Sequence, residues 1–596
     1  MIDPRNPENL HRLRSSIERS REDLEKFRKL RHELISQYVG SHYSRGDDQT
    51  QKSIPVNVLE LAASIYTMQV VGQRPRATVL SGDHTLGRSR SAFQLAINHL
   101  IEEINLEETL SIAFLDAFFL MGIVKVGNTR EKLVEIEGFL HDVGQPSADI
   151  VDFDDWVHDT DERRYEQVKF CGDKYRLPFD YVKESGLFDA KALEKVSPIN
   201  RQRKDEMGNP TADTLSTGNE STNPDVQDYV ELWDIWLPLE NLVITLDDNS
   251  LGLPLRIVEW EGPEMGPYHL LRLNDVPSNI MPTSPASQLY DLQRTLNMGY
   301  RKLFRSAARS KRVGMYQDAE AGRRVKEAND GDMIAVDDVS AVSEAQFGGI
   351  DNNLLAFMIH TNQQFSRQAG NLDVLGGLSP QAGTLGQEQL LSTSANNRVA
   401  HMQGRQTQFT EKILRSLGWH IWYDPMFDPP LVKPIPGTSQ LMSVSFTEED
   451  REGDFLDYNV RIEPYSMTYK SPEMRLQQMN GVLQGVIFPM LPMLQQEGLT
   501  LDIEAILELY AEYGDLPRLR ELIQLSEMQQ NPQGGGDQAR QSPFTSREEI
   551  RRGQSGASPQ GADQVMQQML MGMNPGSQDM SGGGVDTRSG LGAVAG

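Results

Sequence analysis

The most informative stretch of this sequence is SPASQLYDLQRTLNMGYRKLFRSAARSKR (Ser284–Arg312). An apolar stripe recurs every three or four positions after Pro285, at Leu289, Leu292, Leu296, Tyr300, Phe304 and Ala307. This period predicts one long amphipathic helix. The other faces carry seven basic residues, with no acid between Asp291 and Asp318; they are Arg294, Arg301, Lys302, Arg305, Arg309, Lys311 and Arg312.

These basic residues have two interpretations that the sequence leaves open. Arg and Lys stems can cover apolar surface while their charged ends stay in water or pair with acids of a neighbouring chain. Alternatively, the face meets nucleic acid. The net charge of -27 argues against tight DNA binding, because proteins that hold DNA by neutralising phosphates are usually basic. A chain this acidic either never meets DNA or meets it without holding on.

The segment after this helix predicts a small αβ module over 313–349, with a strand in VGMY, a helix in AEAGRRVKEA and a strand in DMIAV. A second long helix is expected from about Asp351 to before Gly370. The stretch Leu372–Gly386 is Gly-rich and poor in charge. It precedes a very long helix from Gln387 to about Tyr423, which Pro425 ends.

The flanking regions predict an α+β fold. Helices are expected over Pro7–Tyr38, Val56–Val71, Arg88–Ile104, Leu106–Met121 and Pro472–Gln524, and strands over Ile123–Val126, Leu133–Phe139, Glu166–Phe170, Tyr229–Trp236, Leu255–Trp260, Leu441–Phe446 and Asn459–Pro464. Ser20 and Arg31 interrupt the apolar stripe of the first helix. The polar stretch Asn200–Asp225 predicts an exposed loop, and the Gly-rich segment 526–596 predicts disorder.

Motifs of common enzyme classes are scarce. The sequence has no Gly-Lys dipeptide, so the phosphate-binding P-loop is missing, and Ser36 stands where a zinc-protease helix starting at His32 needs its second histidine. Cys171, the single cysteine, excludes an intrachain disulfide and fits a reducing cytoplasm. No apolar run is long enough to cross a membrane, and the N-terminus shows no secretion signal.

One acidic segment, VDFDDWVHDTDE, offers hard-metal ligands in Asp152, Asp154, Asp155, His158, Asp159 and Asp161. A metal-dependent hydrolase is therefore the alternative function. The interpretation we prefer is a turn and strand in which Phe153, Trp156 and Val157 pack inward. We expect no catalysis and no cofactor.

The order of parts resembles the portal protein of tailed double-stranded DNA bacteriophages. The segments QVVGQRPRATV (Gln69–Val79), VDFDDWVHDTDE and LSPQAGTLGQEQL (Leu378–Leu390) are similar to portal segments as well. The resemblance implies a wing (1–284, with a long helix 387–424 and strands 425–470), stem helices (285–310 and 351–370), a clip (311–350), a tunnel loop (371–386) and a crown (471–525), followed by the disordered tail 526–596.

The resemblance further implies a ring, usually of twelve subunits, at one capsid vertex of the virion, through which DNA is packaged and ejected. Expected partners are the terminase large subunit, head-tail adaptors, major capsid and scaffolding proteins and passing double-stranded DNA, with no membrane. The site residues it implies are Arg294, Arg301, Arg305, Arg309, Lys311 and Arg312 for the channel, Leu375, Leu378, Gln381, Thr384 and Leu385 for the tunnel loop, and Arg323, Arg324, Lys326 and Glu327 for terminase contact. Another virion protein, such as a head-tail adaptor, remains an alternative.

Overall fold

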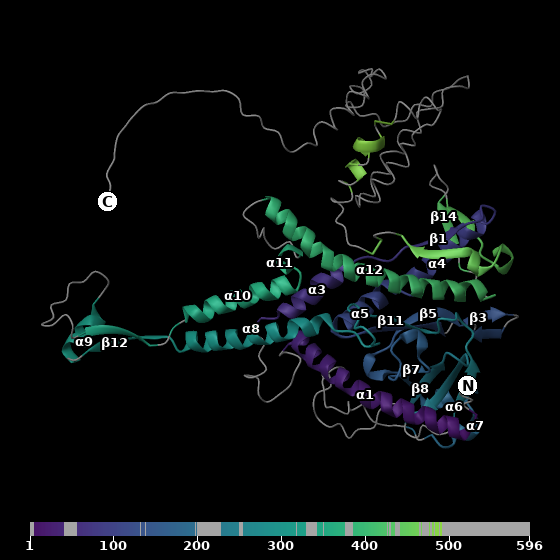
Figure 1. Cartoon of the computed structure of the whole chain (residues 1–596), viewed down its shortest axis with the longest axis horizontal. Coiled ribbons are helices and arrows are strands. Elements are labelled where there is room, and N and C mark those ends of the chain that lie inside the picture. Colours follow the sequence, from purple (N-terminus) through teal and green to yellow (C-terminus); the bar gives the residue numbers. More distant parts are fainter. Residues whose placement is uncertain are drawn as a thin grey trace, which may run out of the picture. The chain divides into compact units, whose positions relative to one another are not determined.

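The computed structural model combines helices with antiparallel sheets, which confirms the predicted α+β class (Figure 1). It describes residues 5–40, 56–130, 133–136, 139–142, 144–196, 198, 228–248, 254–316, 319–328, 342–347, 349, 351–375, 385–425, 427, 429, 431–434, 441–463, 466–467 and short pieces within 476–490. These residues belong to one compact unit, Met1–Leu516.

The main hydrophobic core lies between helices α3 (Val58–Val70), α4 (Gly87–Glu103), α5 (Leu106–Phe119) and the C-terminal half of α12 (Leu385–Tyr423). All four helices were predicted from the sequence, with ends shifted by no more than two residues. Phe93 of α4 is fully buried and contacts four other aromatic rings, those of Trp422, Phe446, Phe455 and Tyr458. Burying such a side chain stabilises the fold by about 1.5–3 kcal/mol.

A three-stranded sheet of order β11–β2–β5 packs against α5 and α12, with β2 at Gly122–Arg130, β5 at Gln145–Ile150 and β11 at Tyr268–Leu271. The chain turns from α5 into β2 at Gly122. A Cβ at this position would overlap the carbonyl of Ala113, so the close approach of strand and helix requires glycine.

A second, five-stranded sheet has the order β10–β9–β8–β7–β6, with β6 at Trp156–His158, β7 at Cys171–Pro178, β8 at Tyr229–Leu237, β9 at Leu242–Asp247 and β10 at Arg256–Glu259. The strand predicted over Glu166–Phe170 is wrong. Val168 and Phe170 alternate and are buried, but the Asp159 carboxylate accepts the Lys169 N–H that a neighbouring strand would have used. The ladder therefore starts only at Cys171.

Helix α1 (Pro7–Val39) packs against β6 and α5. The two residues that interrupt its apolar stripe, Ser20 and Arg31, are both buried. The Ser20 hydroxyl donates to the His158 carbonyl at 2.7 Å, so a polar residue on the apolar face forms a specific attachment to the sheet.

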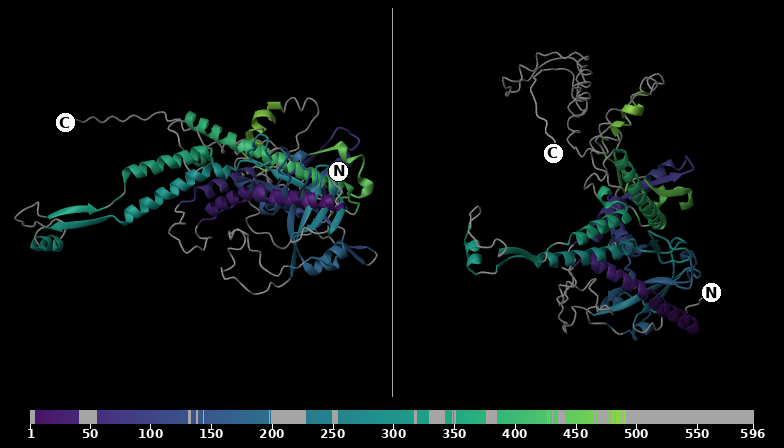
Figure 2. Two further views of the ribbon diagram at one scale, coloured as in Figure 1. Left: turned by 60° about the horizontal axis from the view of Figure 1, so that its bottom comes forward. Right: turned by 60° about the vertical axis from the view of Figure 1, so that its left-hand side comes forward.

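Two long helices and a small sheet form what we call the two-helix arm, residues 285–368. It consists of α8 (Pro285–Ala308), β12 (Lys311–Tyr316), α9 (Ala319–Glu327), β13 (Val342–Phe347) and α10 (Asn352–Gln368). Both helices lie side by side, and β12 and β13 pair antiparallel where the helices end (Figures 1 and 2). The strand predicted in DMIAV lies outside the described residues; the partner of β12 is VSEAQF, which the sequence did not identify.

The remaining elements complete the body. Strands β1 (Ala77–Ser81) and β16 (Tyr458–Ile462) pair antiparallel, as do β14 (Leu431–Pro434) with β15 (Leu441–Val444) and β3 (Leu133–Ile136) with β4 (Phe139–Asp142); α6 (Phe179–Glu184), α7 (Ala190–Leu193) and α11 (Leu372–Leu375) are short. The β structure predicted over Leu133–Phe139 is confirmed, but it is divided between two paired strands. Most of the helical region predicted over Pro472–Gln524 lies outside the described residues, as do the loop 200–225 and the tail 526–596.

Candidate assembly and nucleic-acid interface

The basic residues predicted on α8 gather on one side of the helix. Arg294, Arg301, Arg305 and Arg309 follow one another at intervals of seven, four and four residues, and with 100° per residue this places all four within about 80° of the helix circumference. Arg294, Arg305 and Arg309 are exposed, and Arg301 is half-buried. The stripe extends over about 22 Å.

The opposite side of α8 is buried. Leu289, Leu296 and Leu303 pack inward at intervals of seven residues, and Gln293 and Asn297 are fully buried beside them. Gln293 Nε2 donates to the Val56 carbonyl at 3.2 Å, and Asn297 Oδ1 accepts from the Val56 amide at 3.2 Å. The base of the arm is therefore fixed to the body, and Arg294, Arg305 and Arg309 are exposed on the other side of α8. Lys311 and Arg312 lie in β12, and their side chains are outside the part that the structure describes.

The arm also exposes large apolar side chains. Met298, Phe304, Leu355, Phe357 and Ile359 are between 39% and 55% exposed. Leu355 and Ile359 are one helical turn apart and share a flank of α10. Phe357 lies two residues from each, about 160–200° around the helix, and so projects from the opposite flank. Both flanks of α10 consequently present apolar surface.

The two helices meet closely between these flanks. Met358 is buried, and a Cβ at Gly299 would overlap its sulfur atom, so the helices approach over a residue without a side chain. The contact joins only α8 and α10. Helix α8 also packs against α1, α3 and α5 at the base of the arm, whereas α10 packs mainly against α8 and α11.

The small helix α9 carries the residues predicted for terminase contact. Arg323 pairs with Glu327 at 3.7 Å and Arg324 with Glu320 at 2.9 Å, both one turn apart on the same helix, while Lys326 is exposed. Exposed pairs of this kind contribute little to stability. Of the predicted tunnel-loop residues, Leu375 is half-buried in α11 and Leu385 begins α12; Leu378, Gln381 and Thr384 lie outside the described residues.

The acidic segment Asp152–Glu162 forms the predicted turn and strand, with Phe153, Trp156 and Val157 buried. Its first carboxylates attach α1. Arg31 donates to Asp152 at 2.8 Å and to Asp116 of α5 at 3.0 Å, and His32 Nε2 lies 3.0 Å from Asp154. Burial lowers the pKa of Arg31, but the three surrounding carboxylates raise it more, so it stays charged.

The remaining candidate metal ligands are also engaged. Asp161 pairs with Arg19 at 3.3 Å and Asp155 lies 3.8 Å from Lys174. His158 is buried, accepts from the Trp156 indole, and burial followed by the charge of Arg28 lowers its pKa to about 4. Within the described part of the chain, no group of three or more His, Cys, Asp or Glu side chains could hold a metal ion.

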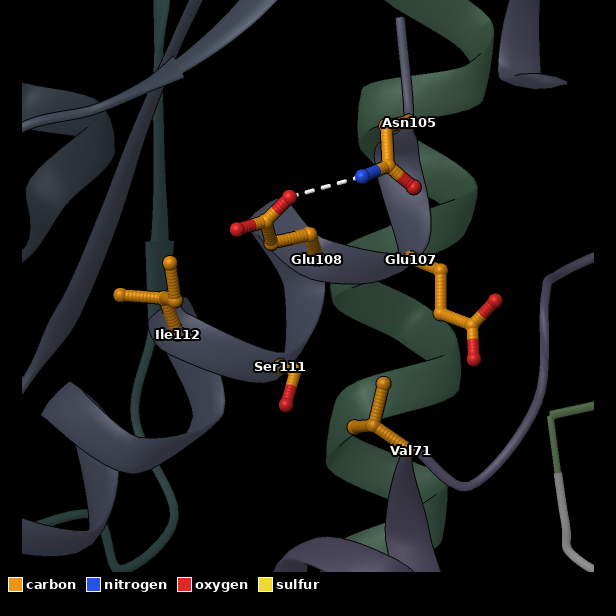
Figure 3. Close-up of a pocket in the computed structure, with 6 residues that line it drawn as sticks. All are labelled: Val71, Asn105, Glu107, Glu108, Ser111 and Ile112. Carbon is orange, nitrogen blue, oxygen red and sulfur yellow. Dashed lines mark hydrogen bonds between the residues drawn. The ribbon is translucent and has the colours of Figure 1, made fainter.

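A surface depression at the start of α5 is lined by Val71, Asn105, Glu107, Glu108, Ser111 and Ile112 (Figure 3). Asn105 donates to Glu108 at 2.7 Å across its rim. Asn105, Glu108 and Ile112 are exposed, so the depression is open rather than an enclosed cavity. It offers no arrangement for binding a buried ligand.

No known family model and no curated protein matches this sequence. Among the residues that the structure describes, no helix is long and apolar enough to span a membrane.

Proposed function

We propose that this chain is the portal subunit of a tailed double-stranded DNA bacteriophage. Copies of it assemble into a closed ring through which DNA enters and leaves the capsid. In this proposal α8 and α10 form the stem, β12, α9 and β13 form the clip that receives the terminase and later the adaptors, and the flanking α+β regions form the wing. The subunit carries out no catalysis.

The observation that carries the proposal is the apolar surface on both flanks of the arm. Phe357 projects from one flank of α10, and Leu355 and Ile359 project from the other. Large apolar side chains gathered in this way favour burial against a partner. A chain that is covered on two opposite flanks needs two neighbours, and head-to-tail contacts between identical chains form a ring when the rotation between neighbours closes the circle.

The charge distribution supports a channel that does not retain DNA. Each phosphate contact adds affinity and therefore resistance to sliding. The net charge of -27 keeps that affinity low, whereas the exposed Arg294, Arg305 and Arg309 form a local cationic stripe on the arm. Such a stripe would guide the duplex along the stem without holding one register.

Electron microscopy and mass measurement of the purified full chain test the proposal. We expect rings with a central opening and a mass close to twelve times 67.0 kDa. Monomers or irregular aggregates at every salt and protein concentration would contradict it. A second assay adds the rings to procapsids with terminase and measures DNA protected from nuclease.

A further inference from the structure

Backbone hydrogen bonds cap the C-terminus of α10 but leave two carbonyl groups without a backbone donor. The Asn371 amide donates to Ser366 O at 2.6 Å and the Gly370 amide to Arg367 O at 3.1 Å. Gly370 and Asn371 both have positive φ, 77° and 59°. This is a Schellman closure, and it does not satisfy the carbonyls of Gln368 and Ala369.

Side chains from two other helices supply the missing donors. The Arg398 guanidinium of α12 donates to Gln368 O, and the Tyr66 hydroxyl of α3 donates to Ala369 O. Arg398 also reaches Gln288 Oε1 of α8 at 3.5 Å, and Gln368 Nε2 donates to Gln288 O at 2.8 Å. The last turn of α10 is thus joined to α3, α8 and α12, which converge beside α11 (Figure 1).

The packing at Gly370 shows how closely the donors approach. A Cβ there would lie 3.3 Å from Arg398 Cδ and 4.0 Å from the Tyr66 hydroxyl. Tyr66 is fully buried and Arg398 is half-buried. Tyr66 belongs to α3 and Arg398 to α12. The position at which the chain leaves α10 is therefore set by contacts with two other helices.

We propose that Arg398 and Tyr66 are positioning residues that cap α10 from α12 and α3 and thereby set where the segment 371–386 departs from the arm. This rests on the proposed function in one respect, since that segment is the one assigned to the channel. Arg398 lies on α12, the helix that follows the segment, so this one side chain links the helices on both sides of it.

Hydrogen exchange of the full chain tests the cap without reference to function. Arg398→Ala and Tyr66→Phe each remove one donor, and we expect exchange of the Gly370, Asn371 and Leu375 amides to become about 5- to 30-fold faster. Arg398→Lys can restore only one of the two hydrogen bonds and should lie between. Arg415→Ala, which removes an exposed arginine of the same helix, is the control and should change nothing. Unchanged exchange in both Arg398→Ala and Tyr66→Phe would overturn the proposal.

A packaging assay then tests the positioning role. Variants whose rings and melting temperature match the wild type should package DNA severalfold more slowly, while Arg415→Ala packages normally. Wild-type rates in variants with accelerated exchange would refute positioning while leaving the portal proposal intact. Failure of the wild type itself to form rings would refute the portal proposal, and the exchange result would still decide the cap.

Discussion

Arg31 and Arg305 show how differently this chain uses one residue type. Arg31 is buried in the body and contacts the carboxylates of Asp116, Asp152 and Asp154 within 3.6 Å. Arg305 is exposed on the arm, and no ion pair of it occurs among the described residues. Arg31 holds elements of one molecule together, whereas Arg305 stays available to something outside it. Composition alone does not separate these two uses.

The largest effect is expected in the body, from Arg31→Ala. This change leaves the carboxylates of Asp116 and Asp154 partly buried without their main counter-ion, which destabilises a fold by about 3–5 kcal/mol. Denaturant unfolding measures it. Arg294→Ala on the arm is the matched control and should stay within about 0.5 kcal/mol of the wild type. An equal loss of unfolding free energy in the two variants would contradict the difference between the buried Arg31 and the exposed Arg294.

The second-largest effect is expected on the stability of the fold at low pH. His269 is buried between β11 and α12 and lies 3.0 Å from the Ser416 hydroxyl; burial, followed by the charge of Lys412, lowers its pKa to about 3. In the unfolded chain the pKa of His269 is about 6.5. Its contribution to the stability of the fold should therefore be fully present above pH 6.5 and be lost as the pH drops from 6.5 towards 3. At pH 4 this loss amounts to about 2–4 kcal/mol.

A His269→Gln variant isolates this contribution. It should be less stable than the wild type at pH 7, and the difference should shrink as the pH approaches 4, because only the wild type must charge a buried imidazole. Unfolding at a series of pH values measures both. Parallel curves for the two proteins would show that His269 does not titrate as its burial requires.

The third effect is on assembly. Phe357→Glu and Ile359→Glu alter opposite flanks of α10, and each should weaken self-association about 10- to 100-fold by removing about 1.5–3 kcal/mol of apolar burial. Neither should change the unfolding of the isolated chain. Sedimentation measures the association.

Mixing the two variants sharpens this test. Each retains one intact flank, so a head-to-tail contact allows one mixed pair and no further growth. Mixed dimers without rings are the expected result. If only one of the two substitutions weakens self-association, the contact is not head to tail and the ring proposal loses its basis.

The smallest effect on the molecule itself is expected from Arg294→Gln, Arg305→Gln and Arg309→Gln combined. Folding and ring formation should persist, because the three side chains are exposed. DNA affinity of the rings should become less salt-dependent, by about 0.9 in log–log slope for each phosphate that is no longer neutralised. The control is Lys29→Gln on α1. Equal slopes for all variants would place the stripe away from the duplex.

The sequence predicts well those elements whose pattern is local. The period of Pro285–Arg312 places the arm helix and its basic stripe, since both depend only on spacing along one helix. Short strands such as QPSADI in β5 and VSEAQF in β13 escape prediction because their partners, not their composition, make them strands. The roles of Arg31 and Ser20 depend on contacts more than 80 residues distant, so a break in the stripe signals them without naming their partners. The spacing of four residues between Glu320 and Arg324, and between Arg323 and Glu327, does indicate pairing within one helix, and the structure shows both pairs.

Gly299 carries a consequence for stoichiometry. The absence of a side chain there lets α8 and α10 touch at Met358, and this contact sets how wide the arm is. In a ring of arms standing side by side, the width of one arm multiplied by the number of copies gives the circumference. In the proposed ring, a methyl group at position 299 that moved α10 away from α8, instead of displacing the Met358 side chain, would widen every copy and change the number of copies that complete the ring.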